Sequence, residues 1–168
     1  MVNKSISLIE MEVAIANHFN IQKHIVIPNI SWGFHIHECD LLLIKKSGYV
    51  IEVEIKRSVN DLKNDFKKKH DHSDNRIKEF YYAIPDYLYD KCIGLIPEHA
   101  GIIICKRYPE TKYKNKTVNE RIEAFIKRQC KNNINARKLT IEEIAKLTRL
   151  GCMRIWKLKM KLIKELKK

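Results

Sequence analysis

The sequence has few of the residues that build nucleotide-binding loops, disulfide frameworks or membrane spans. Its five glycines stand singly along the chain, which excludes a P-loop, a dinucleotide-binding glycine run and a G-x-S-x-G nucleophile elbow. Its five cysteines form no C-x-x-C pair, so we expect neither a disulfide framework nor a cysteine-based zinc site. No apolar run approaches the roughly 18 residues that a membrane span needs, and the N-terminus lacks a signal-peptide pattern. We therefore expect a cytoplasmic protein with no membrane partner.

The composition is that of one folded domain. The chain of 168 residues is long enough for one hydrophobic core and too short for two ordinary domains. Hydrophobic residues make up 45% of the chain and charged residues 32%, which is neither a disordered nor a fibrous composition.

Positive charge is concentrated in the C-terminal third. Residues 1–105 hold 13 Lys and Arg against 14 Asp and Glu, whereas residues 106–168 hold 20 against 6. The formal net charge of +13 therefore belongs entirely to residues 106–168. A basic region of this kind attracts polyanions, so the sequence favours nucleic acid as the partner.

The first two thirds of the chain alternate between helical and extended hydrophobic patterns. Ser7 and Glu10 have the spacing of a capping box, which predicts the start of a helix. The short turn 45–48 between two apolar runs predicts a hairpin. We expect the order helix, three strands, helix, strand, strand, over residues 7–19, 25–30, 38–44, 49–55, 58–70, 79–84 and 101–106, with a short helix within 85–98. This order predicts an α/β core in residues 1–108.

Residues 109–168 predict a basic helical appendage. We expect a lysine-rich loop and then helices over residues 118–131, 141–148 and 152–166. Thr140 and Glu143 form a capping-box pattern, and Gly151 separates the last two helices as in a helix-turn-helix unit.

The last predicted helix has one narrow basic stripe and a broad apolar remainder. We expect the apolar part to pack on the rest of the protein, which would leave the stripe and the neighbouring Arg149 to contact phosphates. The stripe consists of Arg154, Lys157, Lys161, Lys164 and Lys168. A basic amphipathic helix can also lie on an anionic membrane, but that interpretation leaves the acidic residues of the core unexplained.

Several acidic residues stand where apolar residues are expected. Glu12 has Leu8, Ile9, Ile15 and Ala16 as its helical neighbours, which places a carboxylate in the middle of an apolar face. Asp40 opens the apolar run 41–44, and Glu52, Glu54 and Lys56 lie on one face of the third strand. Each feature alone also fits a buried salt bridge or a solvent-facing strand. Their conjunction predicts an active site.

Such a set of residues suits the hydrolysis of phosphodiester bonds. This reaction needs charge stabilisation at the phosphate and a water made nucleophilic near neutral pH, which Mg²⁺ or Mn²⁺ held by carboxylates provides. We expect Asp40, Glu54 and the Ile55 carbonyl to hold the metal, with Glu12 contributing directly or through water. Lys56 would orient or deprotonate the water and stabilise the developing negative charge.

At these residues the chain resembles the PD-(D/E)xK nuclease superfamily. The resemblance consists of Glu12 in the first helix, Asp40 in the second strand and Glu54-Ile55-Lys56 in the third, with the predicted element order agreeing through about residue 106. It implies a restriction-endonuclease-like αβββαβ core with a mixed central sheet. Within the superfamily, residues 38–42 and 52–58 look like small DNA-repair or phage nuclease-like proteins of the MmcB-like type. Cys39 stands where the family motif has proline.

Other residues are secondary candidates. Glu52 shares the face of Glu54, so it either lines the site or serves as an alternative acid. Lys63, Lys67 and His70 lie on one face of the second predicted helix, which in the resembled nucleases flanks the metal site, so they are candidates for contacts with nucleic acid. The His-x-His pairs at 35–37 and 70–72 lack third and fourth ligands at zinc-site spacing.

The sequence therefore predicts a metal-dependent DNA nuclease acting in DNA repair, recombination or phage DNA processing. One alternative is a DNA-binding accessory protein that keeps the nuclease-like fold but does not cut. Another is a Holliday-junction-resolvase-like homodimer, which a small basic chain with this acid set also fits.

Overall fold

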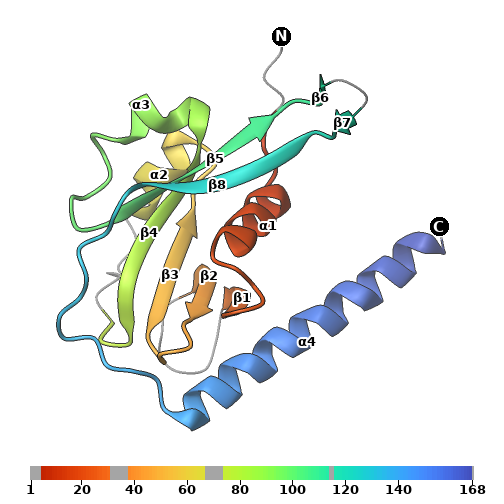
Figure 1. Cartoon of the computed structure of the whole chain (residues 1–168). Helices are drawn as coiled ribbons and strands as arrows, with labels where there is room; N and C mark the ends of the chain where they lie inside the picture. Colours follow the sequence, from red (N-terminus) through yellow and green to blue (C-terminus); the bar gives the residue numbers. More distant parts are fainter. Residues whose placement is uncertain (1–4, 31–37, 67–73, 114–115, 168) are drawn as a thin grey trace.

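The chain folds around one mixed β-sheet with helices on both faces (Figure 1). The computed structural model describes residues 5–30, 38–66, 74–113 and 116–167. The strand order in the sheet is β1-β2-β3-β4-β5-β8, with β3, β4 and β5 parallel and the other neighbours antiparallel. The elements are α1 (Leu8–His18), β1 (Ile25–Ile30), β2 (Cys39–Ile44), β3 (Val50–Ile55), α2 (Val59–Asp65), β4 (Ile77–Pro85), η1 (Asp86–Leu88), α3 (Tyr89–Cys92), β5 (Gly101–Tyr108), β6 (Thr111–Tyr113), β7 (Lys116–Val118), β8 (Arg121–Arg128) and α4 (Ile141–Leu166).

The predicted order of elements is confirmed from α1 to β5. The capping box forms at α1, where the Ser7 hydroxyl accepts the Glu10 amide and the Glu10 carboxylate accepts the Ser7 amide. The hairpin of β2 and β3 forms as expected. The second helix begins after Ser58 as predicted but ends at Asp65, and residues 67–73 lie outside the described part of the chain. The α/β class with a mixed sheet is therefore correct.

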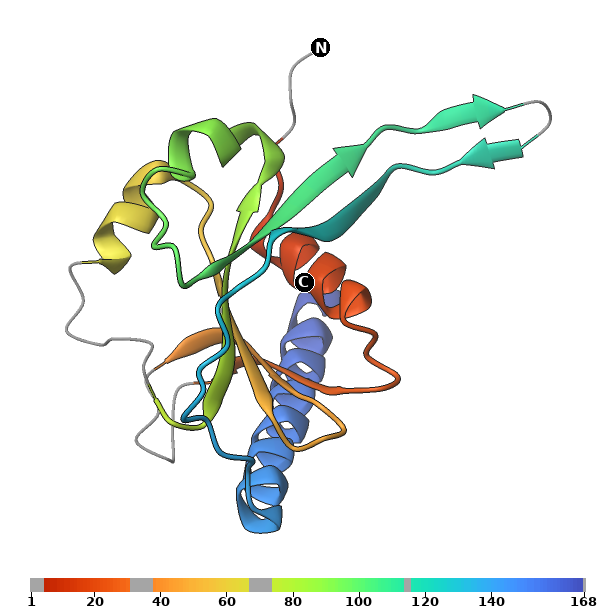
Figure 2. The ribbon, with the colours of Figure 1, turned by 60° about the vertical axis from the view of Figure 1, so that its left-hand side comes forward.

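The helix predicted over residues 118–131 is wrong. Residues 121–128 form β8, which pairs antiparallel with β5, and β6 and β7 extend this pair into a two-stranded arm (Figure 2). The alternation of Ile122, Ala124 and Ile126 with more exposed neighbours fits a strand, because these three side chains pack towards α1 on one face of the sheet. The sheet thus continues beyond residue 108.

The predicted helix-turn-helix unit is also wrong, because α4 is one continuous helix of 26 residues. Gly151 lies inside this helix against β1. A Cβ added at Gly151 would lie 3.4 Å from the Ile27 side chain, so the glycine allows a close approach of helix and strand and is not a turn residue.

Two apolar cores lie on opposite faces of the sheet. On one face α1 packs Met11, Ala14 and Ile15 against the strands. On the other face Leu62 of α2, Cys92 of α3 and Leu147 of α4 close the core. The charged residues described below therefore lie between elements that are themselves well packed.

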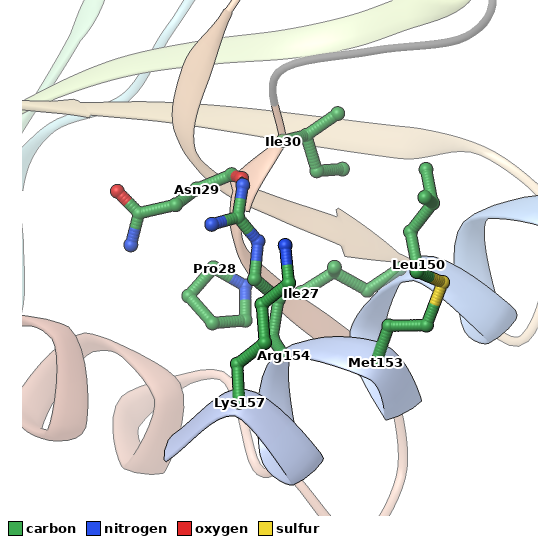
Figure 3. A pocket seen from close by; sticks show the side chains of 8 residues that line it. All are labelled: Ile27, Pro28, Asn29, Ile30, Leu150, Met153, Arg154 and Lys157. Carbon is green, nitrogen blue, oxygen red and sulfur yellow. The ribbon is translucent and has the colours of Figure 1, made fainter. Parts of the chain in front are cut away.

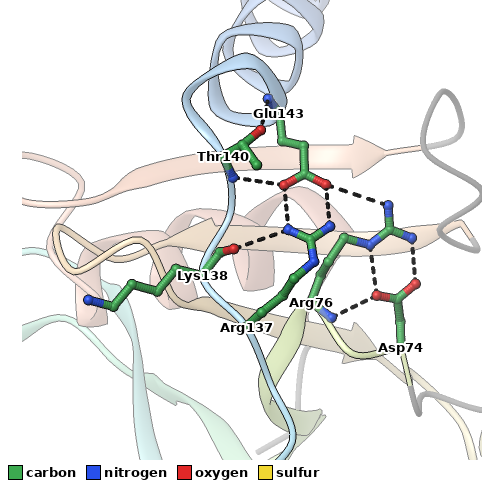
Figure 4. Close-up of polar contacts among 6 residues, drawn as sticks. All are labelled: Asp74, Arg76, Arg137, Lys138, Thr140 and Glu143. Carbon is green, nitrogen blue, oxygen red and sulfur yellow. Dashed lines mark hydrogen bonds and ion pairs between the residues drawn. The ribbon is translucent and has the colours of Figure 1, made fainter.

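Polar contacts fix the start of α4 (Figure 4). The Arg137 guanidinium donates to both oxygens of Glu143, at 2.7 and 2.6 Å, and Arg76 forms a longer ion pair with the same carboxylate. Hydrogen bonding from Arg137 lowers the pKa of Glu143 to about 2. Thr140 completes the capping box that the sequence predicts.

The apolar face of α4 is not packed on the protein as predicted. Leu147 is fully buried, but from Ile155 to the end of the helix every side chain is exposed. The reason is geometric, because α4 crosses β1 with its first half and then runs past the edge of the sheet (Figure 1). No helix among the described residues is both long and apolar enough to cross a membrane.

Candidate active site

Strand pairing brings polar residues of four strands to the same level of the sheet. In the pairing of β2 with β3, Leu41 lies opposite Val53, so the next positions are Asp40 and Glu54. Glu54 in turn lies opposite Tyr82 of β4. On the other side, β1 and β2 pair at residues 28 with 41 and 30 with 39, which places Asn29 beside Asp40. The four residues form a row across the sheet near the end of β3.

Glu12 reaches this row from α1. Its carboxylate accepts a hydrogen bond of 3.1 Å from Asn29 Nδ2. Burial raises the pKa of Glu12, and the nearby negative charge of Asp40 raises it further. Asn29 has a left-handed backbone with φ of 51°, a conformation that asparagine tolerates better than most residues.

The position of Glu12 differs from the prediction in one respect. Of the four apolar neighbours that the sequence places around it, Ile15 is buried but Ile9 is 70% exposed. The buried face of α1 is instead formed by Met11, Ala14 and Ile15, so Glu12 lies at the border of the core. There its side chain is half-buried and can approach Asp40.

Asp40 is held by the backbone of the neighbouring strand. Its Oδ2 accepts a hydrogen bond of 2.7 Å from the Ile55 amide. This bond fixes the carboxylate next to Glu54 at the end of β3. The contact made by Ile55 is thus through its N–H, and the predicted role of its carbonyl as a metal ligand stays a prediction.

Glu54 and Lys56 form a buried ion pair with a third residue, Asp65. Lys56 Nζ lies 2.7 Å from Glu54 Oε2 and 2.7 Å from Asp65 Oδ1. The three side chains are nearly inaccessible to solvent, with residue exposures of 4% for Glu54, 3% for Lys56 and 5% for Asp65. The Tyr82 hydroxyl donates to Asp65 Oδ2 at 2.9 Å. Four residues from β3, α2 and β4 therefore form one connected polar cluster.

The charges in this cluster act on one another. Burial raises the pKa of Glu54 to about 7, with Lys56 opposing the shift and Asp40 adding to it. Burial alone would lower the pKa of Lys56, but Glu54 and Asp65 together raise it. Glu54 Oε1 is buried and has no hydrogen-bond partner among the described residues. The cluster thus contains one carboxylate oxygen that a ligand can still use.

Glu52 and Cys39 lie close to the same charges. Glu52 is fully buried, and its predicted role as a residue that lines the site or as an alternative acid stays a prediction. Burial raises the pKa of the Cys39 thiol, and the charges of Glu52 and Glu54 raise it further. The Cys39 thiol is therefore uncharged and lies close to the carboxylates of the site.

Asp65 and Tyr82 are site residues that the sequence analysis missed. The helical spacing of Leu62 and Asp65 places them on one face of α2, and both are buried. The neighbouring Phe66 is 43% exposed. An acid three residues after a core leucine is the signal that could have identified Asp65.

The basic helix meets the row of polar residues at β1. Arg154 of α4 donates a hydrogen bond to the Asn29 carbonyl, and Asn29 in turn holds Glu12. A pocket of about 110 Å³ lies between β1 and α4 at this point (Figure 3). Arg154 and Lys157 line it from the helix, and residues 27–30 line it from the strand.

The remaining predicted residues that the structure describes do not join this cluster. Lys63 is exposed on α2, and Arg149, Lys161 and Lys164 are exposed along α4. Lys67, His70, Lys168 and both His-x-His pairs lie outside the described residues. Within residues 5–30, 38–66, 74–113 and 116–167, no three His, Cys, Asp or Glu side chains form a group that could hold a metal ion. Mg²⁺, however, is commonly held by one or two carboxylates and several waters.

Comparisons with known proteins support the fold and leave the activity open. No family model and no curated protein matches the chain. A solved structure, the SPO1766 protein of unknown function from Silicibacter pomeroyi, is similar with a TM-score of 0.59 and 13% sequence identity. The match covers 94% of this chain and 91% of that one. The similarity therefore extends over the whole architecture, including the C-terminal third.

Proposed function

We propose that the protein is a metal-dependent deoxyribonuclease that hydrolyses phosphodiester bonds. The observation that carries the proposal is the half-buried Asp40 beside the buried pair Glu54 and Lys56, where two paired strands meet, with Glu12 beside them. Burying carboxylates next to one another is costly, and such groups concentrate at functional sites. The resemblance of these residues to the PD-(D/E)xK motif supplies the reaction class.

The residues fit Mg²⁺ or Mn²⁺. Glu54 Oε1 is buried and accepts no hydrogen bond from a described residue, and Asp40 is near enough to raise the pKa of both Glu12 and Glu54. A divalent cation would relieve this repulsion, and carboxylate oxygens are the ligands that Mg²⁺ prefers. Asp40 and Glu54 would hold the ion, with Glu12 contributing directly or through water. When bound, it would supply charge stabilisation at the phosphate and a more acidic water.

The chain's own groups would then orient and stabilise the reacting phosphate. The Ile55 amide keeps the Asp40 carboxylate in place, and Asn29 does the same for Glu12. The Lys56 ammonium lies between Glu54 and Asp65, where its positive charge would stabilise the negative charge that develops on the phosphate oxygens.

The basic C-terminal third would hold the DNA. Arg149, Lys157, Lys161 and Lys164 are exposed on α4, and Arg154 ties this helix to Asn29 at the edge of the site. Exposed lysines and arginines bind nucleic acid mainly through its phosphates. A duplex bound along α4 would therefore extend towards Asn29 and the acidic residues beside it.

The proposal is tested by a cleavage assay with Mg²⁺ or Mn²⁺ on linear, nicked, flapped and four-way-junction DNA. We expect metal-dependent cutting by the wild type, and loss of at least about a hundredfold in rate for Asp40→Asn and Lys56→Met. Lys91→Met, which removes an exposed lysine on α3, is the matched control and should cut normally. DNA binding on the same samples should persist in all variants. A folded wild type that binds DNA but cuts none of these substrates contradicts the proposal.

A second candidate function is DNA binding without cleavage. The observation that favours it is that the Lys56 ammonium is already paired with two carboxylates, as in a purely structural ion pair. Such a protein would bind DNA in a salt-sensitive manner and would cut none of these substrates with Mg²⁺ or Mn²⁺. The same assay therefore separates the two candidates.

A further inference from the structure

Lys56 lies between two carboxylates that differ in their freedom to move. Its ammonium donates to Glu54 Oε2 and to Asp65 Oδ1 at the same distance of 2.7 Å. The Asp65 carboxylate also accepts the Tyr82 hydroxyl on its second oxygen, at 2.9 Å. Both oxygens of Asp65 are thus engaged, whereas Glu54 Oε1 has no partner among the described residues.

The three partners come from different elements. Glu54 and Lys56 are on β3 and directly after it, Asp65 is at the end of α2, and Tyr82 is on β4 directly opposite Glu54. Asp65 is therefore fixed by the packing of α2 through Leu62 and by a hydroxyl from the neighbouring strand. Among the described residues, the Glu54 carboxylate is held only through Oε2, which accepts the hydrogen bond from Lys56.

This difference between the two carboxylates determines whether Lys56 keeps a counterion when Glu54 turns away from it. A buried lysine without a counterion is strongly disfavoured, and Lys56 is 3% exposed. If Glu54 turned towards a cation, Asp65 would remain as the counterion of Lys56. The ammonium would then stay in place.

We infer that Asp65, oriented by Tyr82, is a positioning residue that keeps the Lys56 ammonium beside the site while the Glu54 carboxylate turns to a divalent cation. This inference rests on the proposed function, since it assigns Glu54 to the cation. It adds two residues, Asp65 and Tyr82, that do not touch the substrate and act through Lys56. A merely structural cluster would tie α2 to the sheet and have no effect on cation binding.

The inference is tested by measuring Mn²⁺ binding to the full chain, for example from the electron paramagnetic resonance signal of free Mn²⁺. Asp65→Asn leaves Lys56 with Glu54 as its carboxylate partner, so Glu54 is less available. We expect the Mn²⁺ dissociation constant to rise at least about tenfold, as for other residues that support a metal ligand. Tyr82→Phe should raise it by a smaller factor. Asp61→Asn, an exposed acid one turn earlier on α2, is the matched control and should leave it unchanged.

Each outcome decides a different question. Thermal unfolding of every variant shows whether it is folded, and Tyr82→Phe replaces Asp65→Asn as the test if the latter does not fold. An unchanged Mn²⁺ dissociation constant in the folded variants overturns the inference, as does a wild type that binds no Mn²⁺. If Mn²⁺ binds, is lost in Asp40→Asn and is weakened in Asp65→Asn, but no DNA is cut, the inference stands and the proposed nuclease function fails.

Discussion

The centre of the sheet contains buried charged residues, whereas the outer half of α4 contains exposed apolar residues. In most folded proteins charged residues are exposed and apolar residues are buried. In the sheet, Glu54 and Lys56 are charged and almost completely buried. On α4, Trp156, Leu158 and Leu166 are apolar and between 62% and 77% exposed. The buried charges are stabilised by one another and by Asp65. The exposed apolar side chains have no such compensation within the described part of the chain, so the helix contributes little to the stability of the core beyond residue 154.

The largest effect is expected from removing the lysine of the buried cluster. Lys56→Met leaves the carboxylates of Glu54 and Asp65 buried without their cation, which should lower the free energy of unfolding by about 3–5 kcal/mol. Urea unfolding measures it. The double variant Lys56→Met/Asp65→Asn should recover part of the loss, because fewer buried charges are then unpaired. A loss below about 1 kcal/mol for Lys56→Met would show that the cluster is open to water.

Replacing a leucine by alanine should change the free energy of unfolding by different amounts in the two halves of α4. Leu147 is fully buried between α4 and the sheet, so Leu147→Ala should lower the free energy of unfolding by about 2–5 kcal/mol. Leu158 is 64% exposed, so Leu158→Ala should change it by less than about 0.5 kcal/mol. Equal losses in the two variants would mean that the outer half is packed in solution.

Because the pKa of Glu54 is raised, we expect the free energy of unfolding to depend on pH. Because the folded chain binds this proton more tightly than the unfolded chain, the contribution to stability is fully present below pH 4.5 and is lost as the pH rises through about 7. Glu12 shifts in the same direction. We expect the wild type to lose on the order of 1–3 kcal/mol over this range relative to Glu54→Gln. Parallel stability curves for the two proteins from pH 4.5 to 8 would contradict this.

The smallest effect is expected from single charges on the outer half of α4. Replacing Lys161 and Lys164 by Gln should lower the salt dependence of DNA binding, with the log–log slope falling by about 0.9 for each phosphate that the protein no longer neutralises. Fluorescence anisotropy at several salt concentrations measures the slope. Lys91→Gln, on the distant α3, is the control. An unchanged slope in the double variant would mean that DNA binds elsewhere.

Much of the core follows from local sequence patterns. The capping box of α1 and the turn between β2 and β3 depend on residues within a few positions of one another. Each of the acids at 12, 40 and 54 stands out against its own apolar neighbours, and Lys56 follows Glu54 by two positions. Such short-range patterns are what a sequence displays directly. The fold class could therefore be predicted, and the same patterns select these four residues as candidates.

The rest depends on contacts between distant segments. Residues 121–128 form β8 because they pair with the edge of β5. Their own alternation of apolar residues is short and by itself does not distinguish a strand from a helix. Gly151 is interpreted as a turn residue until its contact with Ile27 is known. Asn29, Asp65 and Tyr82 enter the site through hydrogen bonds that span nine or more positions in the chain. No local pattern identifies Asn29 or Tyr82, and the spacing of Leu62 and Asp65 places Asp65 on the buried face of α2 without showing which residues it contacts.

The assignment of Asp40 to a cation-dependent nuclease site is tested most directly by measuring DNA binding and DNA cleavage side by side in the wild type and in Asp40→Asn, with and without Mn²⁺. We expect that the wild type cuts only when Mn²⁺ is present, and that Asp40→Asn binds DNA equally well but does not cut. Cutting by Asp40→Asn at the wild-type rate, or no cutting by the wild type in any condition, would contradict this assignment.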